Sequence, residues 1–179
     1  MTETAKMYGG SLYSLAVEEK LEAELLDELE AVADLFRQNS DYMRLLNMQN
    51  LPKKERCALL DEAFRGNVHP YVLNFMKLLC ENGTLRELRG CARAYRMCYN
   101  KANGIAEATA VCAKALTAEQ TEALRQKLEK VSGKKVDLTV KVDAGILGGI
   151  RVEMDGVQLD GSVRKSLEGL RSSIASAAL

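Results

Sequence analysis

The sequence predicts an α+β protein, in which an N-terminal six-helix bundle precedes a small domain of mixed β-sheet and helix. Two observations lead to this fold class. Apolar residues recur with the helical period of about 3.6 through the first hundred residues, and beyond Asn103-Gly104 they alternate with a period of two. The 179 residues are enough for two small domains. We therefore expect a helical domain over residues 1–104 and a second domain over residues 105–179.

Six helices are expected in the first domain, separated by proline, glycine and asparagine. Pro52 and Pro70 each suit the first turn of a helix, where a missing N–H group is tolerated. Asn82-Gly83 provides a C-terminal stop, and Thr84 can cap the helix that follows. The apolar stripes that define the helices are, in order, Tyr8 to Ala16, Leu21 to Phe36, Tyr42 to Leu46, Cys57 to Phe64, Val72 to Leu79 and Leu85 to Tyr99.

The second domain is expected to contain a strand, a helix, three strands and a final helix. Thr117 and Gln120 have the spacing of a capping box, which predicts a helix that ends at Ser132-Gly133. Asp155-Gly156 is typical of a two-residue hairpin turn between neighbouring strands. The alternating or amphipathic segments are, in order, 106–112, 118–131, 136–142, 150–154, 157–159 and 163–174.

The charges of the chain argue against a polyanionic partner. There are 25 basic and 25 acidic side chains, so the formal net charge is zero and no broad field attracts nucleic acid or an anionic membrane. This total conceals a gradient. Residues 1–50 have four basic and ten acidic side chains, a net of −6, whereas residues 51–104 have ten and five, a net of +5. Opposite patches of this kind suit the packing of one helical layer on another, or docking of protein partners.

Cysteine and histidine usage predicts no metal site. The five cysteines include no C-x-x-C pair, and His69 is the only histidine available as a further ligand. We interpret the cysteines as reduced thiols of a cytosolic protein. His69 precedes Pro70 at an expected helix start, and no nucleophile or acid pattern accompanies it, so we favour a capping or turn role over catalysis. The cysteines are Cys57, Cys80, Cys91, Cys98 and Cys112.

Two further patterns have both a functional and a structural interpretation. The segment Gly145–Gly149 follows a strand, as phosphate-binding loops do, but it lacks the Lys-Ser/Thr pair and the helix that such loops need. We favour a backbone role for Gly148 and Gly149, with a small nucleotide-binding enzyme as the alternative. The sixth helix has four arginines on one side, which suit either RNA phosphates or, as we favour, carboxylates of protein. These arginines are Arg86, Arg89, Arg93 and Arg96.

A set of glycine and aspartate motifs in the second domain supports a family resemblance. Val142-Asp143 is followed by Ile146, Gly148, Gly149, Ile150 and Val152, and Asp155-Gly156 by Asp160-Gly161-Ser162. With these motifs, the chain closely resembles the delta subunit of F-type ATP synthase, whose mitochondrial relative is the oligomycin-sensitivity-conferring protein. The N-terminal half agrees more loosely, and the likeness covers nearly the whole chain. It marks Asp143, Gly148, Gly149, Asp160 and Gly161 as structural signature residues of the family.

The resemblance implies a stator protein that performs no chemistry and needs no cofactor or metal. In this family the helical bundle binds N-terminal helices of the alpha subunits, and the C-terminal domain binds the end of the peripheral stalk formed by the b subunits. The first and fifth helices, here residues 4–20 and 70–82, form the groove for an alpha helix. The resemblance therefore assigns to this groove Tyr8, Ser11, Leu12, Leu15, Val72, Phe75 and Leu79.

The expected location is the cytoplasmic side of a bacterial cell membrane. The resemblance implies a role in proton-driven ATP synthesis and hydrogen ion transport, with membrane attachment through the complex. The first residues show no signal or transit pattern, and no stretch of about 18 apolar residues occurs in the chain. We therefore expect a peripheral protein of bacterial origin.

Two positions depart from the family pattern. Gly9-Gly10 lies in the first helix, where glycine either loosens the helix or lets a partner helix approach closely. Asn82-Gly83-Thr84 stands between the fifth and sixth helices, where the family often has basic residues. Both departures affect the expected details of partner contacts.

Overall fold

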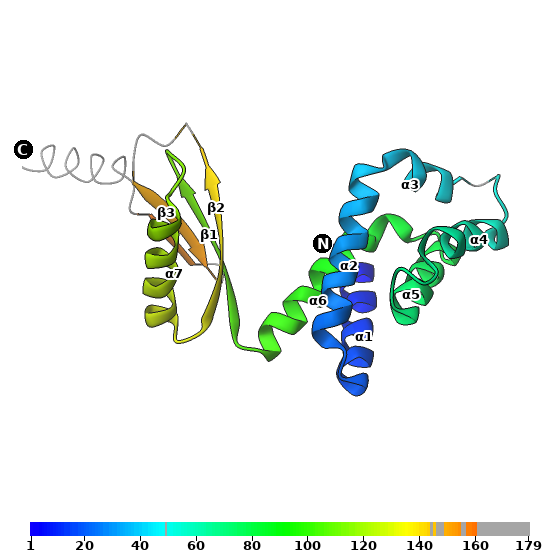
Figure 1. The fold of residues 1–179 in the computed structure, drawn as a ribbon, viewed down its shortest axis with the longest axis horizontal. Coiled ribbons are helices and arrows are strands. Elements are labelled where there is room, and N and C mark those ends of the chain that lie inside the picture. Colours follow the sequence, from blue (N-terminus) through cyan, green and yellow to red (C-terminus); the bar gives the residue numbers. More distant parts are fainter. Residues whose placement is uncertain (49, 144, 146–148, 155–156, 161–179) are drawn as a thin grey trace, which may run out of the picture. The chain divides into compact units, whose positions relative to one another are not determined.

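The chain divides into two compact units, Met1–Tyr99 (unit 1) and Asn100–Leu179 (unit 2). The computed structural model describes residues 1–48, 50–143, 145, 149–154 and 157–160. Unit 1 is helical, and unit 2 contains a sheet with one described helix (Figure 1). The predicted order of helices followed by a mixed sheet and helix is therefore confirmed.

Unit 1 is built from helices that follow one another through short connections (Figure 1). The first and fifth helices match the predicted ranges 4–20 and 70–82 to within one residue at each end. The last helix continues past the unit boundary. The described helices are α1 (Glu3–Glu19), α2 (Glu22–Gln38), α3 (Ser40–Leu46), α4 (Lys53–Phe64), α5 (Pro70–Glu81), the short 3-10 turn η1 (Leu85–Glu87) and α6 (Leu88–Ala102).

Local sequence signals set the starts of α1 and α5. The Thr2 hydroxyl accepts a hydrogen bond from the backbone N–H of Ala5 at 3.2 Å. His69 caps α5, because its Nδ1 accepts a hydrogen bond from Tyr71 N at 3.3 Å, and the predicted capping role is confirmed. The predicted cap at Thr84 is wrong. Its hydroxyl instead donates back to the Leu79 carbonyl at 3.3 Å, which closes the end of α5 rather than the start of a helix.

The core of unit 1 contains buried residues from each of its described helices. Tyr95 of α6 is fully buried and donates its hydroxyl to the Glu22 carbonyl at 3.0 Å, which satisfies the one polar atom of its ring. Burial is also the main reason that the pKa of Tyr95 is raised. Tyr13 meets this ring edge-on, at 5.4 Å between centroids. Other fully buried core residues are Leu25, Leu29, Leu46, Leu60, Val72, Met76, Leu79, Leu85 and Leu88.

Helices α1 and α6 approach each other so closely that only glycine fits at two points. A Cβ atom on Gly9 would lie 2.4 Å from the carbonyl oxygen of Cys91, and a Cβ atom on Gly90 would lie 2.8 Å from the Cβ of Ala5. A Cβ atom on Gly10, in contrast, would meet nothing within 4 Å. Gly9 thus permits a close helix contact, but the neighbouring helix is α6 of the same chain.

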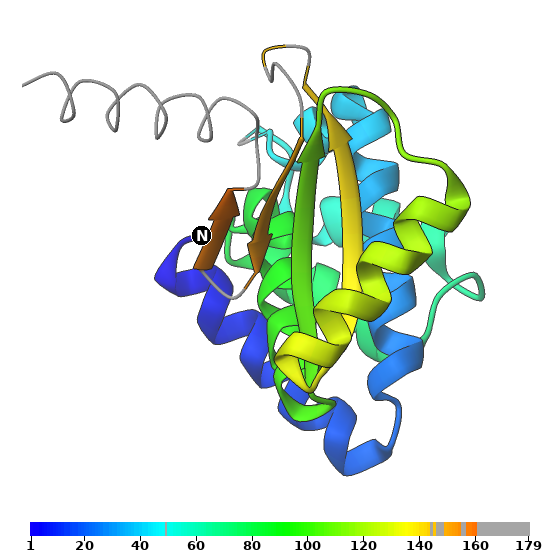
Figure 2. The same ribbon diagram turned by 90° about the vertical axis from the view of Figure 1, so that its left-hand side faces the viewer.

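Unit 2 is a four-stranded sheet with the strand order β2-β1-β3-β4. Strands β1 and β2 are parallel, and the pairs β1–β3 and β3–β4 are antiparallel. Figure 2 shows the helix α7 lying along one face of the sheet. The elements are β1 (Ile105–Cys112), α7 (Ala118–Ser132), β2 (Lys135–Val142), β3 (Ile150–Met154) and β4 (Val157–Asp160).

The core of unit 2 lies between α7 and the sheet. Alternate residues of β1 are buried, and Leu128 of α7 packs on this layer. The predicted capping box of α7 is confirmed: Thr117 Oγ1 accepts from Gln120 N at 3.2 Å, and Gln120 Oε1 accepts from Thr117 N at 3.0 Å. The predicted turn at Asp155-Gly156 and helix over 163–174 lie outside the described residues. The buried sheet residues are Ala106, Ala108, Ala110, Cys112, Val136 and Val152.

Candidate functional site

Helices α1 and α5 meet side by side along a seam on unit 1. Near one end of the seam, the Tyr8 ring lies edge-on to Phe75 at 6.5 Å between centroids, and Asn82 Nδ2 donates to the Tyr8 hydroxyl at 3.2 Å. Near the other end, interaction with the Glu19 carboxylate is the main reason that the pKa of Tyr71 is raised. The start of α1 thus meets the end of α5, so the two helices are antiparallel.

The seven residues assigned to a groove from the sequence lie on these two helices at different depths. Leu12, Val72, Phe75 and Leu79 are buried in the core of unit 1. Tyr8 and Leu15 are half-buried beside that core. Ser11 is exposed, and its hydroxyl donates to the Met7 carbonyl of its own helix at 2.9 Å. The structure therefore brings Tyr8 and Phe75 together, and of the seven only Tyr8, Ser11 and Leu15 present substantial surface.

Three apolar side chains of the same helices, Met7, Val17 and Leu78, are more exposed than the apolar residues assigned from the sequence. Leu78 has 44% of its surface exposed, and Met7 has 61%. Leu78 lies three residues after Phe75 and four before Asn82, so it shares their face of α5. Met7 lies four residues before Ser11 on α1. Because Phe75 was already assigned to the groove, a helical-wheel analysis of residues 70–82 would have placed Leu78 on the same side of the helix and identified it as a groove residue.

The face of the sheet opposite α7 is polar. Register places Glu107 of β1 beside Asp137 of β2, and Thr109 beside Thr139. Glu107 accepts a hydrogen bond from Asn100 Nδ2 at 2.8 Å, and Asp137 and Thr139 are exposed. This sheet face therefore suits a polar contact.

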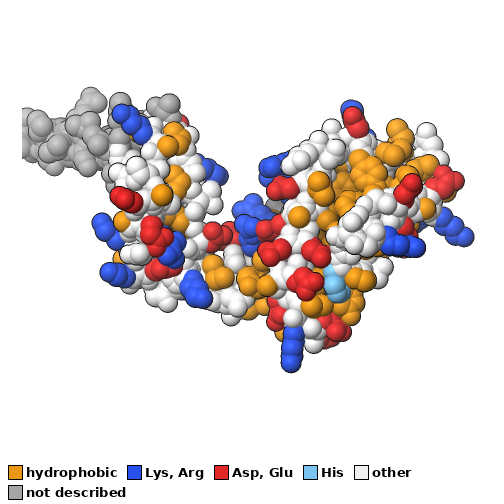
Figure 3. All heavy atoms as spheres, in the orientation of Figure 1, with side chains coloured by type: hydrophobic (Ala, Val, Ile, Leu, Met, Phe, Trp, Pro, Cys, Tyr) orange, Lys and Arg blue, Asp and Glu red, His pale blue; other side chains and the backbone are white. Residues whose placement is uncertain are grey.

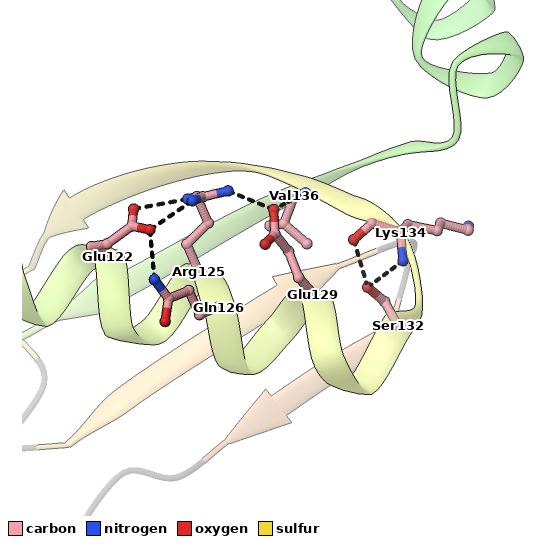
Figure 4. Close-up of polar contacts among 7 residues, drawn as sticks. All are labelled: Glu122, Arg125, Gln126, Glu129, Ser132, Lys134 and Val136. Atoms are coloured by element: carbon pink, nitrogen blue, oxygen red, sulfur yellow. Dashed lines mark hydrogen bonds and ion pairs between the residues drawn. The ribbon is translucent and has the colours of Figure 1, made fainter.

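A network of charged groups ties α7 to the start of β2 (Figure 4). Arg125 donates from Nε and Nη2 to the two carboxylate oxygens of Glu122, at 2.9 and 2.6 Å, and from Nη1 to Glu129 Oε1 at 2.5 Å. Glu129 Oε1 also accepts the backbone N–H of Val136 at 3.2 Å. The Arg125 and Gln126 hydrogen bonds lower the pKa of Glu122 to about 2. The network thus orients α7 on the sheet.

The glycine segment after β2 shows backbone geometry and no phosphate-binding architecture among its described residues. Asp143 Oδ1 accepts the N–H of Gly145 at 2.9 Å, which closes a tight turn. Gly149 has a φ of 87°, in the left-handed region that favours glycine, and the strand β3 follows at Ile150. Asp160 is the last residue of β4. Gly148 and Gly161, the other two signature residues, lie outside the described residues.

The four arginines predicted on one side of the sixth helix lie on η1 and α6 and differ in their ion pairing. Arg96 forms an ion pair with Glu30 of α2, which agrees with the predicted ion-pair role. Arg86, Arg89 and Arg93 form no ion pair with other residues that the structure describes. In the same described part of the chain, no group of three or more His, Cys, Asp or Glu side chains is arranged to hold a metal ion. None of the described helices is both long and apolar enough to cross a membrane.

Comparison with known proteins identifies the family. Residues 4–174 match the sequence profile of the ATP synthase delta (OSCP) subunit. The chain belongs to this family. Among the relatives of this delta family, a protein of Lysinibacillus sphaericus named ATP synthase subunit delta is 32% identical over 93% of this chain and 94% of its own length. The subunit delta of Desulfotalea psychrophila is 30% identical over 97% of this chain and 96% of its own length.

A solved structure shares the fold of this delta family member. A chain of the mitochondrial ATP synthase hexamer of Toxoplasma gondii superposes on this chain with a TM-score of 0.73. The superposition covers 98% of each chain, and their sequences are 21% identical. This likeness concerns the fold. Because the delta family match spans the bundle and the sheet, the alternative of a small nucleotide-binding enzyme at Gly148 and Gly149 is not supported.

Proposed function

We propose that this delta family member is a non-catalytic stator of ATP synthase that links the catalytic head to the peripheral stalk. Unit 1 is the six-helix bundle that binds alpha N-terminal helices, and unit 2 binds the end of the b stalk. The match of residues 4–174 to the delta family carries this proposal. The linkage resists rotation of the head while the rotor turns during proton-driven ATP synthesis.

The alpha-binding surface is the seam between α1 and α5. An amphipathic helix binds by laying its apolar side on an exposed apolar strip, and Leu78, Met7 and half-buried Leu15 offer such a strip. Ser11 lies between them and offers a small polar contact. The buried Leu12, Val72 and Leu79 support the strip from beneath by holding α1 and α5 in place.

The proposed location is the cytoplasmic side of a bacterial cell membrane, where the complex holds the protein. The relatives of Lysinibacillus and Desulfotalea, both bacterial, support a bacterial setting. Attachment through the alpha and b subunits requires no membrane-spanning segment of the delta subunit itself.

Two surface variants test the alpha contact. Leu78→Asp places a charge on the seam, and Leu35→Asp changes a leucine of α2 that is similarly exposed, 47% against 44%. We expect titration calorimetry with an alpha N-terminal peptide to show at least about a tenfold loss of affinity for Leu78→Asp, because a carboxylate is costly to bury in an apolar contact. Leu35→Asp should bind like the wild type. Equal affinities of both variants and the wild type contradict the assignment of the seam.

The same variants separate the two binding functions. Leu78→Asp should still bind a C-terminal peptide of the b stalk with wild-type affinity, because unit 2 is unchanged. Leu12→Asp is a poorer test, because Leu12 is 5% exposed and a carboxylate buried there is expected to unfold the bundle. If Leu78→Asp also failed to bind the b peptide while its thermal transition stayed unchanged, the assignment of alpha binding to unit 1 and b binding to unit 2 would be wrong.

A further inference from the structure

A hollow in unit 1 lies where α3 ends, α4 begins and α5 leads into η1. Three cationic side chains line it: Lys53 from the first turn of α4, Arg56 from the next turn, and Arg86 from η1. Glu81 at the end of α5 is the one carboxylate of the lining. The hollow therefore has an excess of positive charge from three separate positions in the fold.

Arg56 is held in place but incompletely bonded. Its Nη1 donates to the Leu46 carbonyl at 3.2 Å, so the guanidinium is fixed against the end of α3. Its Nε is buried and has no hydrogen-bond partner in the described part of the chain. The guanidinium is therefore anchored by one hydrogen bond, and its charge is not paired with a carboxylate among the described residues.

The other lining groups are arranged so that the positive charge stays available. Within the described residues, Lys53, Arg56 and Arg86 form no ion pair, whereas Lys77 of the neighbouring helix pairs with Asp61 at 2.5 Å. The side-chain amides at the edge are already used: Asn47 Nδ2 donates to Met43 O at 2.7 Å, and Asn82 Nδ2 to the Tyr8 hydroxyl. These two hydrogen bonds hold the edge of the hollow in place.

The N-terminus of α4 adds to the positive potential of the hollow. Lys53 is the first residue of this 12-residue helix, and Pro52 at the N-cap position provides no side-chain hydrogen bond. The N–H groups of the first turn therefore lack a capping acceptor, and the positive end of the helix dipole lies at the rim. An anion in the hollow would interact favourably with this end and with the three cations.

We propose that this hollow binds a phosphate group, as inorganic phosphate or as a phosphomonoester. A phosphate dianion has several acceptor oxygens and two charges, which match the cations from these three positions. Arginine binds phosphate through paired N–H donors, and lysine binds it as a point charge. The hollow adjoins one end of the α1–α5 seam, where Asn82 belongs to both, but the proposal does not depend on the proposed stator function.

Amide NMR of the full chain, titrated with sodium phosphate at constant ionic strength, tests the proposal. We expect saturable shifts at residues 53, 56 and 83, and similar affinity for AMP if a nucleotide supplies the phosphate, since the same group is recognised. Arg86→Gln and Lys53→Gln should each weaken binding by about tenfold, because each removes one charge-assisted contact. Arg93→Gln removes an exposed arginine of α6 outside the hollow and should leave the affinity unchanged.

Several outcomes overturn the proposal. They are shifts that grow linearly without saturation, an affinity that Arg93→Gln lowers as much as Arg86→Gln, and tight binding of an oligoglutamate peptide that phosphate does not displace. The last result would assign the hollow to a carboxylate partner. Because Arg86 and Lys53 are exposed at the rim, neither variant should affect folding, and unchanged thermal transitions check this.

Discussion

Gly9 and Gly10 are neighbours in α1 with opposite structural roles. Gly9 lies against the backbone of α6, where a Cβ atom would be 2.4 Å from the Cys91 carbonyl oxygen and 2.7 Å from the Cβ of Ala94. Gly10 faces open space. Of these two glycines, the close contact therefore requires only Gly9, and Gly10 costs helix stability without packing against any described residue.

Alanine substitutions of Gly9 and of Gly10 are expected to change the free energy of unfolding in opposite directions. Gly9→Ala should lower the free energy of unfolding by about 1–3 kcal/mol, because the added methyl group overpacks the α1–α6 contact. Gly10→Ala should raise it by about 0.5–1 kcal/mol through helix propensity. Urea unfolding monitored by circular dichroism measures both changes, and each variant is the control for the other. A shift of both variants in the same direction contradicts the packing of α1 on α6.

The cysteines differ in their access to solvent. Cys80, Cys91 and Cys112 are buried, whereas Cys57 and Cys98 are half-buried. Burial is the main reason that the pKa of Cys91 is raised to about 11. A thiol with this pKa is on the order of 0.1% thiolate at pH 8, and the thiolate is the reactive form.

We expect a thiol reagent at pH 8 to label Cys57 and Cys98 of the folded protein well before Cys91. Labelling with iodoacetamide over time, followed by peptide mass spectrometry, gives the rate at each cysteine. In denaturant all five thiols should react at similar rates, which serves as the control. Labelling of Cys91 in the folded protein as fast as Cys98 would show that the α1–α6 contact opens readily.

Among the elements, Arg125 bonds Glu122 and Glu129 of its own helix α7, and Glu129 in turn accepts the backbone N–H of Val136 in β2. The pKa of Glu122 is lowered in the folded state, from an ordinary 4.5 to about 2, chiefly by the Arg125 hydrogen bonds. A lowered folded-state pKa means that the interaction stabilises the fold above about pH 4.5. This contribution is lost as the pH falls toward about 2.

Carboxyl NMR of the folded protein should therefore give a titration midpoint of about 2 for Glu122. Arg125→Met should move this midpoint up toward 4.5, because the main cause of the shift is removed. Lys127→Met changes an exposed cation of the same helix outside the network and should leave the midpoint in place. A midpoint near 4.5 in the wild type would show that Arg125 does not hold Glu122 in solution.

The starts of α5 and α7 could be predicted from the sequence because they depend on neighbouring residues. The packing of the helices could not be predicted in this way. The Thr117–Gln120 capping box and the His69 cap follow from local chemistry, and both are present. The depth of Leu12 and Val72 depends on which other helices cover α1 and α5, so helical periodicity alone could not separate core from seam. Likewise, alternation located β1 and β2, but their parallel pairing, with β2 at the edge of the sheet, depends on the crossover through α7.

In the whole molecule, each of the two units offers a surface that suits a protein partner. Unit 1 has an apolar seam with Leu78 and Met7 exposed, and unit 2 has a polar sheet face with Asp137 and Thr139 exposed. In unit 1, His69 caps α5, and the buried Tyr95 donates its hydroxyl to the backbone carbonyl of Glu22. Because the delta family match spans both units, we propose that adhesion at both is the work of the protein.

We propose that this chain couples the head of ATP synthase to its stalk. Inverted membrane vesicles from a bacterium lacking its own delta subunit, reconstituted with the head and this protein, provide the decisive experiment. ATP-driven proton pumping should be restored by the wild type and by Leu35→Asp, and lost with Leu78→Asp, while ATP hydrolysis by the head in solution stays unchanged. Full proton pumping in vesicles to which no delta subunit was added would contradict the claim.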